Sequence, residues 1–252
     1  NIDFEFVPAA ATANFNTFIH DLTLAFHDQI PGSEVSIAMP SVDWSNAYDY
    51  NYLSDNCDGL MIMAYGYYWS RSSRAGPNSP LYSGLSSWYI SRTIQDYLTK
   101  TGQDGSQLIL GLPWYGRDWQ VTSSAMNASV ARDALGEIIP GVSIFYPSAE
   151  TNAQAYGKQY HTGVAAAWYN YNNGQQHQVW YDDSTSLATK YQYAVDMDIK
   201  GVGIWALGYD GGRAEIWGGL SDIFGATAPP RTSRYFTVKN LGNGTVLVHC
   251  AF

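Results

Sequence analysis

The sequence has few cysteines, few charged residues and no long apolar run, and each shortage excludes a class of protein. Cys57 and Cys250 are the only cysteines in 252 residues, and neither lies in a Cys-x-x-Cys or histidine-rich pattern, so no disulfide framework or zinc site is predicted. Only 14% of the residues are charged and the net charge is −9, which argues against nucleic acid and anionic lipid as partners. No apolar run approaches the roughly 20 residues that span a bilayer.

Aromatic residues, by contrast, are abundant, with 20 Tyr and 9 Trp in the chain. This number exceeds what core packing alone usually requires. Flat rings with polar atoms at their edges stack on sugar faces and hydrogen-bond to sugar hydroxyls. The composition therefore favours a carbohydrate-binding cleft. The chain also has 46% hydrophobic residues, enough to bury the core of one large α/β domain or of two small ones.

Short apolar runs alternate with helical patterns along the chain. Apolar residues recur at helical spacing over 15–26 and 90–98, and a further helix is expected over 184–198. The predicted strands are the runs Ile2 to Val7, Val35 to Met39, Leu60 to Tyr65, Leu108 to Leu112 and Val202 to Leu207.

This alternation predicts a parallel α/β fold, either a doubly wound sheet or a (β/α)8 TIM barrel. No strand is followed by a glycine-rich phosphate loop, which favours the barrel, expected over residues 1–225. A loop over 66–88 and an insertion over 117–182 interrupt the alternation before the last helix and strand. Residues 226–233 are then expected to be a linker, and 234–252 the start of a truncated β domain.

The opening run, NIDFEF, combines two carboxylates with a strand pattern. A period of two places Asn1, Asp3 and Glu5 on one face and the apolar residues on the other. In a barrel, the face opposite the helices points into the interior and mouth. Burying carboxylates there costs free energy, which is a reason to expect that they have a catalytic role. This pair is therefore the first candidate for a catalytic site.

At this point the sequence resembles glycoside hydrolase family 18, the chitinase-like barrels, whose fourth strand carries D-x-x-D-x-D-x-E. Here the pattern is present as NIDFE, and further matches follow in the family's order: SIAMP, MAY, GLPWYGRDW, VWYDDSTSLATKYQYA and GVGIWALGYDGG. The resemblance covers residues 1 to about 225 and is strongest to the bacterial branch with spore-cortex and cell-wall hydrolases. It implies that the chain holds about strands 4 to 8 of an incomplete barrel and that the biological protein is longer at both ends.

The resemblance also implies a substrate-assisted, retaining mechanism, an exception to the usual pair of catalytic carboxylates. The acetamido oxygen of the sugar attacks its own anomeric carbon. Glu5 would protonate the leaving oxygen and later deprotonate water. Asp3 would orient the acetamido N–H and balance the positive charge of the oxazolinium intermediate.

The remaining site residues are implied by the same resemblance. Tyr65 matches the family tyrosine that hydrogen-bonds the acetamido group, and Met63 helps to shape that pocket. Trp205 matches the tryptophan that forms the floor under the sugar at the cleavage point. Tyr115 and Arg117 match cleft residues near that sugar. The chain departs from the fuller motif at two positions, because Asn1 and Gly66 stand where many members have Asp.

The leading hypothesis is a hydrolase of β-1,4 bonds in N-acetylglucosamine polysaccharides such as chitin. A second enzyme hypothesis is that the same reaction takes place on peptidoglycan or on an N-glycan core as the substrate. A hypothesis of another class is a non-catalytic, lectin-like barrel, against which the retention of Glu5 speaks.

Neither a cofactor nor a metal is expected, since His20 and His27 have no second ligand at metal-binding spacing. The expected partner is a polysaccharide or oligosaccharide that contains N-acetylglucosamine. The proline-containing linker and the β segment after it predict an extracellular or cell-surface protein.

Overall fold

The computed structural model describes residues 1–225, 237–239 and 245–248 of the chain. Its helices are the 3-10 turn η1 (Ala9–Ala11), α1 (Thr12–Gln29), α2 (Tyr50–Asn56), α3 (Ile90–Lys100), α4 (Tyr146–Tyr156), α5 (Ser184–Asp196) and α6 (Ala214–Phe224). Its strands are β1 (Ser36–Pro40), β2 (Gly59–Met63), β3 (Leu108–Pro113), β4 (Tyr115–Gln120), β5 (Val142–Phe145), β6 (Gln159–His161), β7 (Ala166–Asn172), β8 (Gln176–Tyr181), β9 (Gly201–Trp205), β10 (Thr237–Lys239) and β11 (Thr245–Val248).

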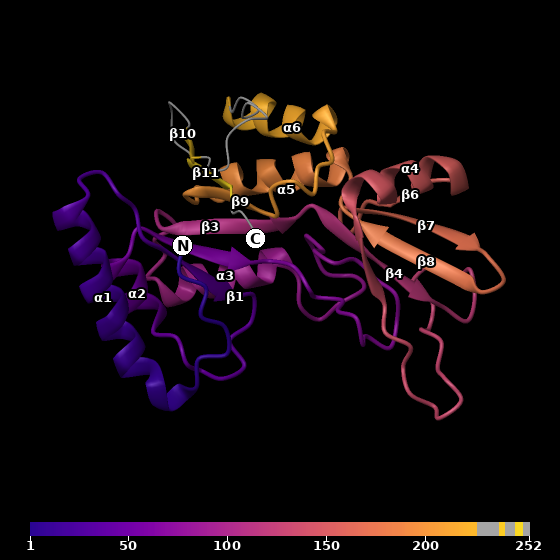
Figure 1. The fold of residues 1–252 in the computed structure, drawn as a ribbon, viewed down its shortest axis with the longest axis horizontal. Coiled ribbons are helices and arrows are strands. Elements are labelled where there is room, and N and C mark those ends of the chain that lie inside the picture. The colour runs from indigo at the N-terminus through magenta and orange to yellow at the C-terminus, as the bar shows by residue number, and fades with distance from the viewer. Residues whose placement is uncertain (226–236, 240–244, 249–252) are drawn as a thin grey trace.

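The centre of the fold is a parallel sheet in which β1, β2, β3 and β9 are neighbours in that order. Four of the five predicted strands form it, and their side chains are almost all buried. Helices join successive strands, and the predicted α1, α3 and α5 are all present. Figure 1 shows α5 and α6 along one side of this sheet. The expectation of an incomplete (β/α) barrel is confirmed at this level.

The predicted first strand, Ile2 to Val7, is wrong as a strand. Only Ile2 forms a β bridge, through hydrogen bonds to Ser36 O (2.7 Å) and from Ala38 N (2.8 Å). Phe6 has φ of +56°, a left-handed conformation that breaks an extended run. Among the described residues, only β1 pairs with this segment. The backbone hydrogen bonds that would keep it extended therefore come from one side only.

The predicted insertion over 117–182 is a second sheet, and it begins slightly earlier than expected, at Tyr115. Its strands are antiparallel in the order β5-β4-β8-β7-β6, and α4 packs against β4, β5, β7 and β8. Figure 1 places this sheet at the end of the molecule far from α1. The loop predicted over 66–88 contains neither a helix nor an extended strand, as expected.

The C-terminal part is described only in two strands. β10 and β11 pair antiparallel, and β11 lies parallel to β9. The predicted linker over 226–233 and Cys250 lie outside the described residues, so the division into domains stays a prediction. Within the part of the chain that the structure covers, no helix is both long and apolar enough to span a membrane.

Candidate active site

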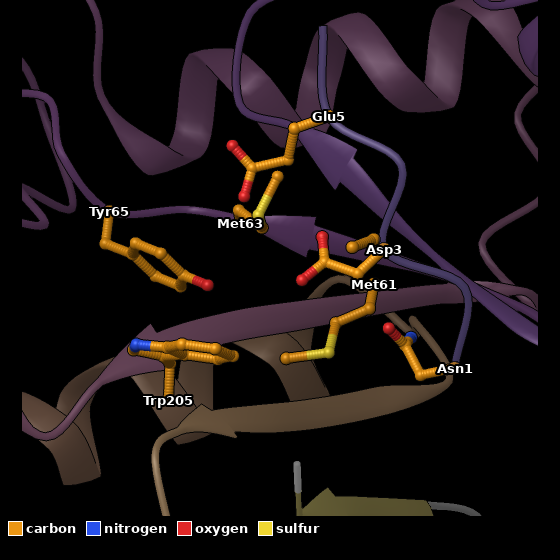
Figure 2. A pocket seen from close by; sticks show the side chains of 8 residues that line it. Asn1, Asp3, Glu5, Met61, Met63, Tyr65 and Trp205 are labelled. Carbon is orange, nitrogen blue, oxygen red and sulfur yellow. The ribbon is translucent and has the colours of Figure 1, made fainter. Parts of the chain in front are cut away.

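A cavity of about 170 Å³ lies between the N-terminal segment and the parallel sheet. Figure 2 shows its lining side chains, which come from the N-terminal segment, β1, β2, the turn after β2 and the end of β9. The lining residues are Asn1, Asp3, Glu5, Ala38, Met61, Met63, Tyr65 and Trp205. Five of the seven predicted site residues are therefore brought together here: Asp3, Glu5, Met63, Tyr65 and Trp205.

The N-terminal segment delivers both carboxylates to this cavity although it is not a regular strand. The Ile2 bridge to β1 fixes one end of the segment, and the Tyr48 hydroxyl donates a hydrogen bond of 3.1 Å to the Phe4 carbonyl further along. Side chains of extended backbone alternate in direction, so Asp3 and Glu5 point to one side. Figure 2 shows both carboxylates directed into the cavity.

The turn after β2 positions Tyr65. Gly66 has φ of +77°, a conformation that suits glycine, and its N–H donates to Asn78 Oδ1 at 3.0 Å. The Asn78 amide in turn donates to the carbonyl of Tyr115 at 3.3 Å. Asn78 thus ties the turn to the start of β4, a role that the sequence did not indicate.

The Tyr65 hydroxyl points toward the middle of the cavity (Figure 2). Burial raises the pKa of Tyr65 well above its ordinary value, and Tyr115, Asp3 and Glu5 raise it further. The hydroxyl therefore keeps its proton at any physiological pH. It is available as a hydrogen-bond donor beside two carboxylates.

The apolar floor of the cavity is formed by Trp205 with Met61 beside it (Figure 2). Met61 and Ala38, which are partners in the β1–β2 register, were missed by the sequence analysis. The period of two along β2 could have identified Met61, because it lies two residues before Met63 and shares its face. A flat indole with thioethers around it is a surface on which the apolar face of a sugar can stack.

Tyr115 and Arg117 do not line this cavity. The Tyr115 ring is adjacent to it, in an edge-to-face arrangement with the Tyr65 ring at a centroid distance of 6.2 Å and an interplanar angle of 72°. Arg117 lies two residues further along β4 and donates to the Gly141 carbonyl at 3.3 Å. Burial lowers the pKa of Arg117 below its ordinary value, while Tyr115 opposes this shift.

The arrangement combines two carboxylates, a protonated phenol and an aromatic floor in one partly open cavity. Such a set can hold a sugar, protonate an oxygen and stabilise a positive charge near the proton donor. Over residues 1–225 and the two C-terminal strands, no group of three or more His, Cys, Asp or Glu side chains is placed to hold a metal ion.

Comparisons with known proteins agree with this geometry. The chain is 30% identical over 209 residues to di-N-acetylchitobiase of Mus musculus, covering 74% of this chain and 53% of that protein. It is 24% identical to the cortical fragment-lytic enzyme of Bacillus subtilis, covering 89% of this chain and 49% of that protein. The chain thus spans about half the length of the curated relatives it matches.

The likeness extends to solved structures. The Group IV chitinase of Ostrinia furnacalis in complex with allosamidin superposes with a TM-score of 0.76 at 18% identity, over 88% of this chain and 67% of that one. This likeness supports the incomplete barrel. The model of glycosyl hydrolases family 18 matches residues 1–210, and the chain therefore belongs to that family, as its sequence motifs indicated.

Proposed function

We propose that the protein hydrolyses β-1,4 glycosidic bonds in polysaccharides that contain N-acetylglucosamine, with Glu5 as the catalytic acid. The observation that supports this most is the convergence of Asp3, Glu5 and the Tyr65 hydroxyl on one cavity above Trp205. The names of the relatives point the same way, since they include di-N-acetylchitobiases and chitinases.

The proposed reaction has two steps and uses the acetamido group of the substrate as nucleophile. First, the acetamido oxygen attacks the anomeric carbon, the glycosidic bond breaks, and Glu5 donates its proton to the leaving oxygen. Second, water attacks the anomeric carbon of the oxazolinium intermediate from the side that the leaving group vacated, and Glu5 takes a proton from it. Two inversions give a product with retained configuration.

The neighbouring side chains would support both steps. Asp3 accepts a hydrogen bond from the acetamido N–H and opposes the positive charge of the intermediate. Tyr65 donates a hydrogen bond to the acetamido group, because its hydroxyl stays protonated. Trp205 carries the apolar face of the sugar. Met63 limits the size of the acetamido pocket, while Tyr115 and Arg117 would extend the wall toward the second sheet.

A peptidoglycan or N-glycan-core substrate is the second candidate. It is favoured by the similarity to the cortical fragment-lytic enzyme of Bacillus subtilis, and the chemistry at the acetamido sugar would be the same. Either substrate fits an extracellular or cell-surface location. A lectin-like protein is the third candidate, and the carboxylate of Glu5 in the cavity speaks against it.

The test compares the wild-type, full-length protein with Glu5→Gln and Asp3→Asn on chitooligosaccharides and on muropeptides. We expect each substitution to lower kcat by about 100-fold or more on the true substrate. Glu34→Gln is the matched control, because Glu34 is exposed next to the opposite end of β1 and its loss should leave turnover unchanged. Equal turnover by wild type and Glu5→Gln would refute the assignment, and binding of glycan without turnover by either would favour the lectin.

The stereochemistry of the product tests the mechanism separately from the substrate. Proton NMR during the first minutes of hydrolysis should show the β-anomer at the new reducing end, before mutarotation. Initial appearance of the α-anomer would exclude the substrate-assisted route while leaving the hydrolase assignment intact.

A further inference from the structure

Tyr65 lies two residues beyond the end of β2, where the ladder of the parallel sheet no longer fixes its backbone. Within the described part of the chain, no side chain is hydrogen-bonded to its hydroxyl. Figure 2 nevertheless shows the hydroxyl directed into the cavity. The position of this hydroxyl therefore depends on what holds the backbone on either side of Tyr65.

Two consecutive buried polar residues, Asn78 and Ser79, hold that backbone. The Ser79 hydroxyl donates a hydrogen bond to the carbonyl of Ala64, the residue before Tyr65. On the other side, Asn78 Oδ1 accepts a hydrogen bond of 3.0 Å from the N–H of Gly66. The two side chains thus enclose Tyr65 between a fixed carbonyl and a fixed N–H.

Burial fixes the orientation of both side chains. Asn78 is 2% exposed and Ser79 is 1% exposed, and polar atoms at such sites need hydrogen-bond partners in the protein. The backbone carbonyl of Asn78 adds a further contact to the same turn, because it accepts from Tyr67 N at 3.1 Å. The turn that carries Tyr65 is therefore held by the main chain of this segment as well as by its side chains.

The segment that carries Asn78 is itself anchored at two places. The Pro80 carbonyl accepts a hydrogen bond of 2.8 Å from the N–H of Ile90, the first residue of α3. Leu81 N donates to the Val164 carbonyl, between β6 and β7, at 2.9 Å. The side chains of Leu81, Ile90 and Val164 are fully buried. The support behind Tyr65 is thus connected to a helix of the barrel and to the second sheet.

The amide of Asn78 also relates the turn to β4. Its Nδ2 donates to the carbonyl of Tyr115, the first residue of that strand, at 3.3 Å. The two partners distinguish the ends of the amide, because the N–H of Gly66 can only donate and a carbonyl can only accept. An aspartate or a leucine in place of Asn78 could not supply both contacts in the ionised or the apolar form. This single side chain therefore sets Tyr65 relative to the Tyr115 wall.

We infer that Asn78, assisted by Ser79, is a positioning residue for the reaction, which holds the turn so that the Tyr65 hydroxyl meets the acetamido group of the substrate. The inference rests on the proposed function. Neither residue lines the cavity, so both act through Tyr65. A group that acts on developing charge is effective only over a narrow range of positions, and a displacement of about 1 Å can cost about 100-fold in rate.

The experiment is a double-mutant cycle in the full-length protein, with the tetrasaccharide of N-acetylglucosamine as the substrate. The variants are Asn78→Ala, Tyr65→Phe and the two combined, and Ser79→Ala is a milder second change to the same support. Asn127→Ala is the matched control. Asn127 is also buried and its amide donates to a carbonyl of the same loop, that of Ala75, at 2.7 Å, but these contacts do not flank Tyr65.

We expect Asn78→Ala to lower kcat by about 10-fold or more, with a smaller change in KM. In the Tyr65→Phe background the hydroxyl is already absent, so adding Asn78→Ala should cost less than about 2-fold. Ser79→Ala should show the same dependence on Tyr65 with a smaller loss. Asn127→Ala should lower the midpoint of urea denaturation and leave kcat unchanged.

The outcomes separate this inference from the proposed function. Loss of kcat by the same factor in both backgrounds, or a wild-type kcat in Asn78→Ala, would overturn the positioning role and leave the hydrolase assignment standing. If Asn78→Ala does not fold, Ser79→Ala gives the same comparison, because it removes one hydroxyl and keeps the shape of the side chain.

If wild type binds the tetrasaccharide in calorimetry without cleaving it, the proposed function fails, and the dissociation constant takes the place of kcat in the cycle. Weaker binding by Asn78→Ala only where Tyr65 is present would then still support the positioning role, and equal weakening in both backgrounds would overturn it. Absence of both cleavage and binding by wild type would overturn both proposals.

Discussion

Met61 fills the space that Gly203 leaves by having no side chain. A β-carbon built on Gly203 would lie 2.9 Å from Met61 Cε and 3.3 Å from its sulfur. Gly111 pairs with Gly203 across β3 and β9 and also faces this methionine, at 3.5 Å from its own β-carbon position. The two glycines therefore allow the Met61 side chain to lie beside Trp205 in the cavity.

Gly203→Ala should change the site more than the fold. The contact falls on the end of a flexible side chain, so we expect a stability loss below about 1.5 kcal/mol. Displaced Met61 would press on the sugar at Trp205, and kcat/KM should fall by about 10-fold or more. Gly111→Ala is the comparison, because its β-carbon would lie 2.5 Å from the Ile62 carbonyl oxygen, which is backbone and cannot easily yield.

We expect Gly111→Ala to cost about 1–3 kcal/mol. Chemical denaturation and steady-state kinetics on both variants measure the two effects. The account of Met61 would be wrong if Gly203→Ala lost more stability than Gly111→Ala, or if it kept full activity.

A second prediction concerns the Tyr65 hydroxyl. Removing this donor with Tyr65→Phe should lower kcat by about 100-fold, because it would act on charge that develops during the reaction. Tyr67→Phe is the matched control two residues away, where the hydroxyl is 2.8 Å from Thr93 Oγ1. Its loss should cost about 1 kcal/mol of stability and leave kcat unchanged. Similar kcat values for the two variants would remove Tyr65 from the mechanism.

A third prediction concerns the buried ion pair between Lys190 of α5 and Asp182, which follows β8. Burial raises the pKa of Asp182 to about 6, although Lys190 opposes this. Lys190→Met would leave this carboxylate buried without its partner, at a cost of about 3–5 kcal/mol. The loss should grow as the pH rises through and above 6, since a carboxyl with a raised folded-state pKa is less costly to bury while protonated.

The double variant Asp182→Leu, Lys190→Met tests the cause. Replacing both members of a buried pair by apolar residues often restores stability, so we expect urea denaturation to show most of the loss recovered. A double variant no more stable than Lys190→Met would mean that the pair has a role other than mutual neutralisation.

The parts of the fold that the sequence predicted are those with a strong local signal. β1, β2, β3 and β9 are continuous apolar runs, since they are buried on both faces. Motif matches similarly led to Glu5, Asp3 and Tyr65. The second sheet escaped detection because its strands have no such signal. β5 is largely exposed and β6 is QYH, so their extended form depends on partners distant in the chain.

The errors at the site have the same origin. NIDFEF has a strand pattern, but pairing requires neighbours, and only Ile2 finds one on β1. Conversely, Met61 lies in an apolar run that predicted only a strand, and its place in the cavity depends on Gly203, 142 positions later in the chain. Asn78 joins Gly66 to Tyr115 by side-chain hydrogen bonds, and no local sequence pattern predicts such a contact.

A last prediction concerns Glu150, which fastens α4 to the antiparallel sheet. Its carboxylate accepts hydrogen bonds from Tyr181 of β8 at 2.7 Å, from Lys158 at 3.0 Å and from Gln154 at 3.1 Å. Burial by itself raises the pKa of Glu150, but these hydrogen bonds together hold it below the ordinary 4.5. The contribution of the carboxylate is therefore complete above about pH 5 and is lost as the pH falls through the folded-state pKa.

Glu150→Gln should accordingly lose about 1.5–3 kcal/mol at pH 7, the usual value of hydrogen bonds to a charged group. The gap between variant and wild type should close as the pH falls through the folded-state pKa of Glu150, which lies below 4.5, because wild type then loses the same charge. Urea denaturation of both proteins from pH 3 to pH 8 measures this. A gap that stayed constant over that range would show that Glu150 acts through packing or neutral hydrogen bonds, and that its ionisation contributes nothing to the attachment of α4.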